Sequence, residues 1–167
     1  MDKALVSNHE DFQSIKREVI LLKNISHPFI VDLYEVFETD QFIYIISEYL
    51  SKGELYDKIV QSKYLSEEES AFYFYQILTA LDYIHLHKIA HRDIKPENIL
   101  VDWGGRVKLI DFGLSNLFPG DVSLRTSCGS PCYAPPEMIE RREYDGRGTD
   151  IWSLGVTLYA MTTGKLA

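Results

Sequence analysis

The chain has 167 residues and a formal net charge of −8, because 25 Asp and Glu outnumber 17 Lys and Arg. Its length suits one domain, and its hydrophobic fraction of 46% excludes an intrinsically disordered chain. The acidic balance argues against nucleic acid as a main partner, and no apolar run approaches the ~18 residues of a membrane span, so we expect neither among the partners.

The first third of the chain should contain one helix and two strands. Residues 11–25 are expected to be helical, because apolar side chains recur there at helical spacing. Residues 30–37 and 42–49 have the composition of strands, and residues 54–60 are expected to form a short helix. The apolar face of the first helix would consist of Phe12, Ile15, Val19 and Leu22.

A longer helix is expected after Ser66. Ser66 and Glu69 have the spacing of a capping box, in which the Ser side chain accepts a hydrogen bond from the backbone three residues later. A polar loop, 91–98, follows this helix. The buried side of the helix would consist of Phe72, Tyr75, Leu78, Leu81 and Ile84.

The remaining elements are two short strands, a long loop and a final helix. The strands flank Trp103-Gly104-Gly105, which has the composition of a hairpin turn. Residues 111–137 lack periodicity and are rich in Gly, Ser and Pro, which indicates a functional loop. Residues 149–161 are mostly apolar and predict a buried helix. A strand-containing part, residues 1–50, thus precedes a helical part, residues 51–167.

The long loop holds both cysteines, Cys128 and Cys132. Two cysteines are too few for a disulfide framework, and no His lies within thirty residues before them or anywhere after them to complete a zinc site. We therefore expect free thiols in a reducing compartment, either the cytoplasm or the nucleus.

The strongest chemical signal is three motifs in a fixed order. The run His91-Arg92-Asp93-Ile94-Lys95-Pro96-Glu97-Asn98 is followed, eighteen residues after Asp93, by Asp111-Phe112-Gly113. Pro135-Pro136-Glu137 begins twenty-four residues after Asp111. Each motif alone would indicate only a polar turn, but the joint match resembles the catalytic loop, metal-binding triplet and activation-segment anchor of protein kinases.

The resemblance implies roles for the catalytic-loop residues. Asp93 would orient the substrate hydroxyl and accept its proton, and Lys95 would neutralise charge on the transferring phosphate. A Lys at this place resembles serine/threonine kinases. Asn98 and Asp111 would ligate Mg²⁺, since both offer hard oxygen ligands, so ATP and Mg²⁺ are the expected cofactors.

Other residues resemble the nucleotide-binding parts of the family. Glu18 matches the helix residue that pairs with the ATP-anchoring Lys, although a solvated helix Glu would look the same. The backbone of Glu48 and Leu50 would meet adenine at the hinge, after a small gatekeeper at Ser47. Leu100 is also assigned to nucleotide binding, and Glu54 would touch the ribose.

Internal packing residues are implied as well. A stacked hydrophobic spine would consist of Leu22, Leu33, His91 and Phe112. Asp150 resembles the buried residue that holds the backbone of the catalytic loop.

The segment 124–131 resembles the calmodulin-dependent and AMP-activated kinase group. By this resemblance an upstream activating kinase would phosphorylate Thr126, and Arg92 would bind the phosphate. Ser123, Ser127 and Ser130 are rival acceptors, although Ser130 matches a substrate-binding hydroxyl. Glu97 and Glu54 would read a basic residue upstream of the phosphoacceptor in a protein substrate, while an ordinary surface carboxylate is as good an explanation for Glu54.

The match also has gaps. No Gly-rich loop precedes the first helix, and Lys3 comes too late in the chain to replace the anchoring Lys. We therefore expect an α+β, two-lobed kinase-like fold truncated at both ends, with a small lobe lacking its first strands and a large lobe lacking its last helices. Such a chain alone would be poorly stable and have weak or no activity. The alternative function is a catalytically silent kinase-like binding or scaffold module.

Overall fold

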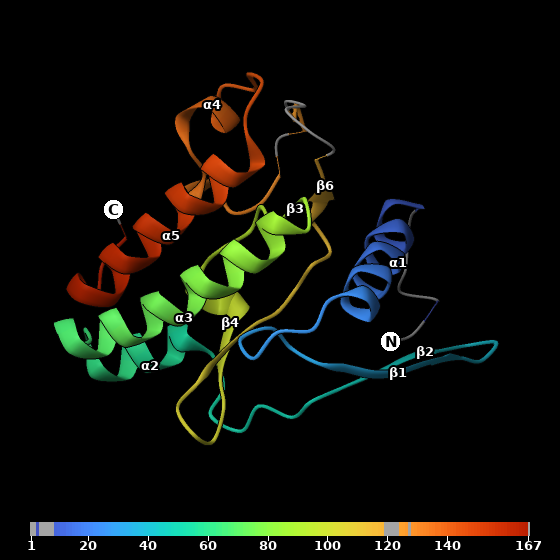
Figure 1. The fold of residues 1–167 in the computed structure, drawn as a ribbon, viewed down its shortest axis with the longest axis horizontal. Helices are drawn as coiled ribbons and strands as arrows, with labels where there is room; N and C mark the ends of the chain where they lie inside the picture. The colour runs from blue at the N-terminus through green and yellow to red at the C-terminus, as the bar shows by residue number, and fades with distance from the viewer. Residues whose placement is uncertain (1–2, 4–8, 119–123, 127, 167) are drawn as a thin grey trace.

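A helix and a two-stranded hairpin form the N-terminal part of the computed structural model, which describes residues 3, 9–118, 124–126 and 128–166 (Figure 1). Helix α1 spans His9–Asn24, and strands β1 (Leu33–Glu38) and β2 (Ile43–Ser47) pair antiparallel. The predicted helix followed by two strands is therefore confirmed. The strands are shorter than predicted, and their register shifts between Leu33 and Glu35.

Four helices and two short antiparallel strand pairs form the rest of the described fold. Helices α3 and α5 pack against each other, and α2 lies beside β4 (Figure 1). Strands β4 and β5 pair antiparallel, as do β3 and β6. The helices are α2 (Leu55–Ser62), α3 (Glu67–Leu86), α4 (Pro136–Ile139) and α5 (Gly146–Thr163), the 3-10 turns are η2 (Pro96–Asn98) and η3 (Pro131–Tyr133), and the strands are β3 (Ile89–Ala90), β4 (Ile99–Val101), β5 (Val107–Leu109) and β6 (Asn116–Leu117).

Helix α3 begins as the capping pattern predicts. The Ser66 Oγ accepts a hydrogen bond from the backbone N–H of Glu69 at 3.1 Å, which satisfies a donor that the first turn leaves open. The Glu69 side chain does not close the box. It forms an ion pair with Lys58 of α2, with Nζ 2.8 Å from Oε1, and so links the starts of two neighbouring helices.

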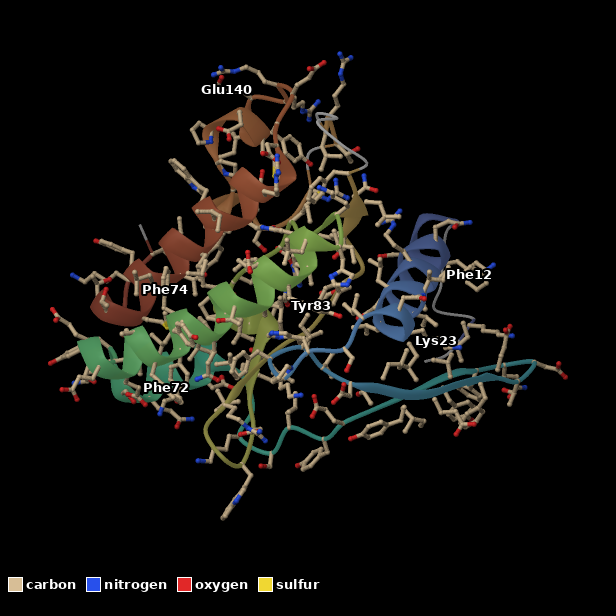
Figure 2. All side chains as sticks on the ribbon, viewed as in Figure 1. Phe12, Lys23, Phe72, Phe74, Tyr83 and Glu140 are labelled. Carbon is tan, nitrogen blue, oxygen red and sulfur yellow. The ribbon has the colours of Figure 1, made fainter. Side chains whose placement is uncertain are left out.

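The predicted buried face of α3 is partly wrong. Leu81 and Ile84 are fully buried, but Phe72 (labelled in Figure 2), Tyr75 and Leu78 are exposed. Helix α3 is apolar on nearly every side, so spacing alone did not distinguish its faces. The face that contacts α5 and β5 is rotated by about one residue from the predicted face. Its apolar residues are Tyr73, Ile77, Ala80, Leu81 and Ile84.

The N-terminal part joins the rest through backbone pairing with β5. Val31 N–H donates to Leu109 O at 3.1 Å, and Leu109 N–H donates to Phe29 O at 2.8 Å. Ile30, Leu109 and the residues around them belong to one core cluster that also includes Leu22 of α1 and Phe112. One hydrophobic core therefore runs from α1 to α5, beneath the loop of residues 91–98.

Helix α5 is only half buried, which corrects the prediction of a buried helix. Leu154, Thr157 and Met161 are buried, whereas Ile151, Trp152 and Tyr159 are exposed on the opposite side. Within the described part of the chain, no helix combines the length and hydropathy needed to cross a bilayer.

Candidate functional site

Asp150 of α5 fixes the backbone of the loop that carries the predicted catalytic residues. Its fully buried carboxylate accepts hydrogen bonds from the N–H groups of His91 at 2.9 Å and Arg92 at 2.7 Å. The His85 ring lies 2.8 Å from the same carboxylate. The predicted scaffold role of Asp150 is confirmed, because these bonds hold two successive residues immediately before Asp93.

Asp93 lies at the centre of a polar cluster. Lys95 Nζ donates to Asp93 Oδ2 and to Ser130 Oγ, both at 2.8 Å. The Ser130 hydroxyl and backbone N–H both donate to Asp93 Oδ1 at 3.0 Å. Asn98 Nδ2 donates to Asp93 Oδ2 at 2.9 Å. The structure thus gathers four of the predicted site residues, including Ser130 from thirty-five residues beyond Lys95.

These contacts keep Asp93 ionised. Burial alone would raise the pKa of Asp93, but the hydrogen bond and charge of Lys95, together with hydrogen bonds from Ser130 and Asn98, outweigh burial and lower the pKa. A carboxylate with a lowered pKa is a weak base. Asp93 is therefore suited to accept a hydrogen bond from an incoming hydroxyl and to orient it.

One backbone hydrogen bond connects Asn98 to Ile110, the residue before Asp111. Ile110 N–H, directly before Asp111, donates to the Asn98 carbonyl at 3.0 Å. The Asn98 amide uses its nitrogen toward Asp93 and leaves Oδ1 without a hydrogen-bond partner among the described residues. This pair of oxygen donors fits Mg²⁺, which is usually held by one or two carboxylates plus substrate phosphates.

A metal site made of protein side chains alone is not found. The described residues contain no group of three or more His, Cys, Asp or Glu placed to hold an ion. Any Mg²⁺ at Asn98 and Asp111 would therefore need ligands from the nucleotide as well.

The Asp111-Phe112-Gly113 turn is anchored on both sides. Asp111 has φ +62°, a left-handed conformation that few residues other than Gly adopt, and its Oδ1 accepts from Gly113 N–H at 3.3 Å. The fully buried Phe112 ring meets the His91 ring edge-on, with centroids 4.9 Å apart. On the other side, Ser14 Oγ donates to Gly113 O at 2.7 Å.

Glu18 of α1 faces this turn. Burial raises the pKa of Glu18, the negative charge of Asp111 raises it further, and a backbone hydrogen bond with Phe112 lowers it in part. Lys3 does not serve Glu18, because it pairs with Glu38 at 2.5 Å and donates to Thr39 O at 2.6 Å. No described Lys or Arg forms an ion pair with Glu18. The negative charges of Glu18 and Asp111 would therefore favour a bound cation between or beside them.

The predicted hinge contains an ion pair that the motif analysis missed. Lys108 Nζ of β5 lies 2.7 Å from Glu48 Oε1 and donates to Ile30 O at 3.1 Å. Glu48 Oε1 also accepts from Asp32 N–H at 3.1 Å. A signal existed, because Lys108 interrupts the apolar run around Val107 and Leu109 and a charge in a buried strand needs a partner.

The other predicted nucleotide-site residues lie close to this hinge. The backbones of Glu54 and Leu100 form an isolated antiparallel bridge, so these two residues are direct neighbours. Leu50 is partly buried against the core, while Ser47 at the end of β2 is exposed. The structure therefore brings Glu54 and Leu100 together from different predicted segments.

Glu97 lines a pocket near the Asp93 cluster. The pocket has a volume of ≈ 380 Å³ and is lined by residues that include Tyr56, Glu97, Ser130 and Tyr133. Glu97 Oε2 is inaccessible to solvent and has no hydrogen-bond partner among the described residues. Because a buried carboxylate oxygen without a partner is costly, this position favours a donor supplied from outside the chain.

The predicted regulatory residues meet through a tyrosine. Arg92 is buried, and its Nε and Nη2 donate to Leu114 O at 2.8 and 2.5 Å. Thr126 is exposed and has no direct contact with the Arg92 guanidinium, since Tyr144 lies between them. Ser123 and Ser127, the rival acceptors, lie outside the described residues. Cys128 and Cys132 are free thiols.

Comparison with known proteins gives one family. Residues 1–167 match the protein kinase domain family. NUAK family SNF1-like kinase 1 of Homo sapiens is 46% identical over 164 residues, covering 98% of this chain and 25% of that protein. Serine/threonine-protein kinase SIK2 of Gallus gallus is 46% identical over 156 residues, covering 93% of this chain and 20% of that protein.

A third relative comes from an amoeba. Probable serine/threonine-protein kinase MARK-A of Dictyostelium discoideum is 45% identical over 157 residues, covering 94% of this chain and 15% of that protein. The chain thus spans a quarter or less of the length of each of these three relatives.

Proposed function

Because the chain belongs to the protein kinase domain family, we propose that it serves in the transfer of the ATP γ-phosphoryl group to a Ser or Thr hydroxyl of a protein substrate. One observation carries the proposal: the Asp93 carboxylate is held by Lys95, Asn98 and Ser130 in a single cluster. This arrangement provides an oriented acceptor for a hydroxyl, next to a positive charge.

Each residue of the site has a distinct task in this reaction. Asp93 accepts the hydrogen bond of the substrate hydroxyl and orients its oxygen, and Lys95 offsets the charge of the phosphoryl group in flight. Asn98 and Asp111 would hold Mg²⁺, which neutralises charge on the nucleotide phosphates. The adenosine part would lie by the hinge, against Glu48, Leu50, Glu54 and Leu100.

The substrate class follows from Glu97. Glu97 lines the pocket beside Ser130, which itself contacts Asp93, and its buried Oε2 has no hydrogen-bond partner among the described residues. A guanidinium of the substrate would supply the missing donors, since Arg–carboxylate pairs are strong and directional. We therefore propose substrates with a basic residue upstream of the phosphoacceptor, read by Glu97 with help from Glu54.

Regulation is proposed to act through Thr126. The Thr126 side chain is exposed and therefore accessible to an upstream activating kinase, and a phosphate there would bring nearly two negative charges close to buried Arg92. Free thiols agree with a cytoplasmic or nuclear location.

One specific observation supports a second candidate, a kinase-like binding module without catalysis. The negative charge of Asp111 helps to raise the pKa of Glu18, and no described Lys or Arg forms an ion pair with Glu18. Without a cation there, nucleotide phosphates would meet two negative charges and bind weakly.

The experiment that separates the two functions uses the purified chain with ATP and Mg²⁺. It compares two peptides that differ only in one Arg upstream of the Ser, and it includes the Asp93→Asn variant as a control. Phosphate incorporation that depends on both the Arg and Asp93 supports the kinase. No incorporation at any enzyme concentration contradicts the kinase and favours the binding module. Equal incorporation by Asp93→Asn contradicts the role proposed for Asp93.

A further inference from the structure

Tyr144 connects two parts of the molecule that the proposed regulation brings together. It lies before α5 and is only 3% exposed. Its hydroxyl donates to the Thr126 carbonyl at 2.6 Å and accepts from Arg92 Nη1 at 3.2 Å. One phenol oxygen therefore bridges the backbone of the predicted phosphorylation site to the guanidinium predicted to bind its phosphate.

The backbone of Tyr144 also binds the segment that contains Thr126, through two hydrogen bonds with Leu124. Leu124 N–H donates to Tyr144 O at 2.8 Å, and Tyr144 N–H donates to Leu124 O at 3.0 Å. The side chains of Leu124, Met138 and Tyr144 form a small core of their own, separate from the main core. Residues 124 and 126 are thus both attached to Tyr144.

The Tyr144 hydroxyl is well suited to a structural bridge. Burial raises the pKa of Tyr144, and the hydrogen bond and charge of Arg92 lower it only in part, so the hydroxyl stays protonated and can donate. Arg92 cannot leave easily, because two of its nitrogens donate to Leu114 O and its backbone is bound by Asp150. Arg92 is therefore held by contacts outside the bridge, at Leu114 and Asp150.

We propose that Tyr144 is a positioning residue: in the unmodified chain its hydroxyl holds the segment around Thr126 on Arg92 until a phosphate on Thr126 takes over this contact. The inference rests on the proposed function for the identity of Thr126 as the modified residue. A phosphate accepts from a guanidinium more strongly than a phenol does, so the modified segment no longer depends on Tyr144.

The test measures amide hydrogen exchange at Leu124 in the purified 167-residue chain, with no need for catalysis. Tyr144→Phe keeps the ring in its small core and removes only the hydroxyl. Loss of the two hydrogen bonds of this hydroxyl, to Thr126 O and from Arg92 Nη1, should speed Leu124 exchange roughly tenfold. The matched control is Tyr75→Phe, which removes a hydroxyl from an exposed side chain of α3 and should leave Leu124 exchange unchanged.

A second preparation separates positioning from packing. Tyr144→Phe carrying phosphothreonine at position 126 should return Leu124 exchange to within about twofold of the phosphorylated parent chain. Unchanged Leu124 exchange in Tyr144→Phe, failure of phosphothreonine to restore it, or an equal rise at Ile77 and Leu81 of α3 would each overturn the proposal. If all chains lack kinase activity while the exchange pattern holds, the proposed function fails and the Tyr144 bridge stands.

Discussion

Lys108 and Glu48 form an ion pair between β5 and the hinge, with Lys108 Nζ 2.7 Å from Glu48 Oε1 and the Lys108 side chain only 7% exposed. The same Nζ reaches the Ile30 carbonyl. Three segments that are distant in sequence therefore meet at one ammonium group, three residues before Asp111. The pair thus joins Glu48 of the proposed adenine site to the strand that leads to Asp111 of the proposed metal site.

Removing this ammonium should destabilise the chain strongly. Lys108→Met leaves the Glu48 carboxylate poorly solvated and without its cation, so we expect the free energy of unfolding to fall by about 3 kcal/mol. Urea denaturation followed by circular dichroism measures this change. The control is Lys58→Met, which breaks the half-exposed pair with Glu69 and should cost less than ~1 kcal/mol. A similar decrease in the free energy of unfolding in both variants would show that the buried Lys108–Glu48 pair stabilises the chain no more than the half-exposed pair does.

Neutralising Asp93 should remove catalysis with little effect on folding. Asp93→Asn keeps the shape of the side chain but is a much poorer proton acceptor, so kcat on the Arg-containing peptide should fall ~10²- to 10⁴-fold. The melting temperature should move by only a few degrees. Steady-state kinetics and a thermal melt on the same preparation give both values, and a kcat within a factor of ten of the parent would refute the assigned role.

The carboxylate pair of Glu18 and Asp111 should make stability depend on pH. The pKa of Glu18 is higher in the folded chain than its ordinary value of about 4.5 in the unfolded chain. The folded state therefore loses stability as the pH rises from about 4.5 through the raised folded pKa, because Glu18 ionises more readily in the unfolded chain. Glu18→Gln should therefore melt a few degrees higher than the parent at pH 7 and at nearly the same temperature at pH 3.5.

Mg²⁺ provides an internal check on that prediction. If the ion binds near Asp111, adding it at pH 7 should narrow the difference in melting temperature between Glu18→Gln and the parent. A parent chain that melts above the Gln variant at pH 7 without any metal would contradict the electrostatic argument.

Glu97 should control the choice of substrate and leave the chemical step unchanged. Glu97→Gln keeps an acceptor oxygen but loses the charge, so we expect KM for the Arg-containing peptide to rise about tenfold with kcat within twofold of the parent. The peptide without Arg should be phosphorylated equally by both chains. A rise in KM for both peptides would indicate general damage to the groove.

The sequence predicted the local features well where a single residue type decides the geometry. Ser66 caps α3 because its hydroxyl satisfies an open backbone donor, and the turn at Gly104-Gly105 joins β4 to β5. The catalytic-loop residues were found by order and spacing. What spacing did not supply is their mutual contact, such as Ser130 on Asp93 across thirty-seven residues.

Prediction was weaker where tertiary contacts decide. The buried face of α3 depends on where α5 docks, so Phe72 and Tyr75 were placed on the wrong side. Tyr144 has no motif of its own, and its role becomes visible only once Thr126 and Arg92 are both in place. Lys108 was detectable in principle, as a charge inside an apolar strand, but its partner Glu48 lies sixty residues earlier.

The hydrogen bonds from His91 and Arg92 to Asp150 also have a consequence for the order of assembly during synthesis. The loop leaves the ribosome about sixty residues before the helix that completes it, so two of its amides bond to water and not to Asp150 until α5 docks on α3. The arrangement of the loop seen in the folded chain therefore cannot be complete until Asp150 has been made and α5 has docked.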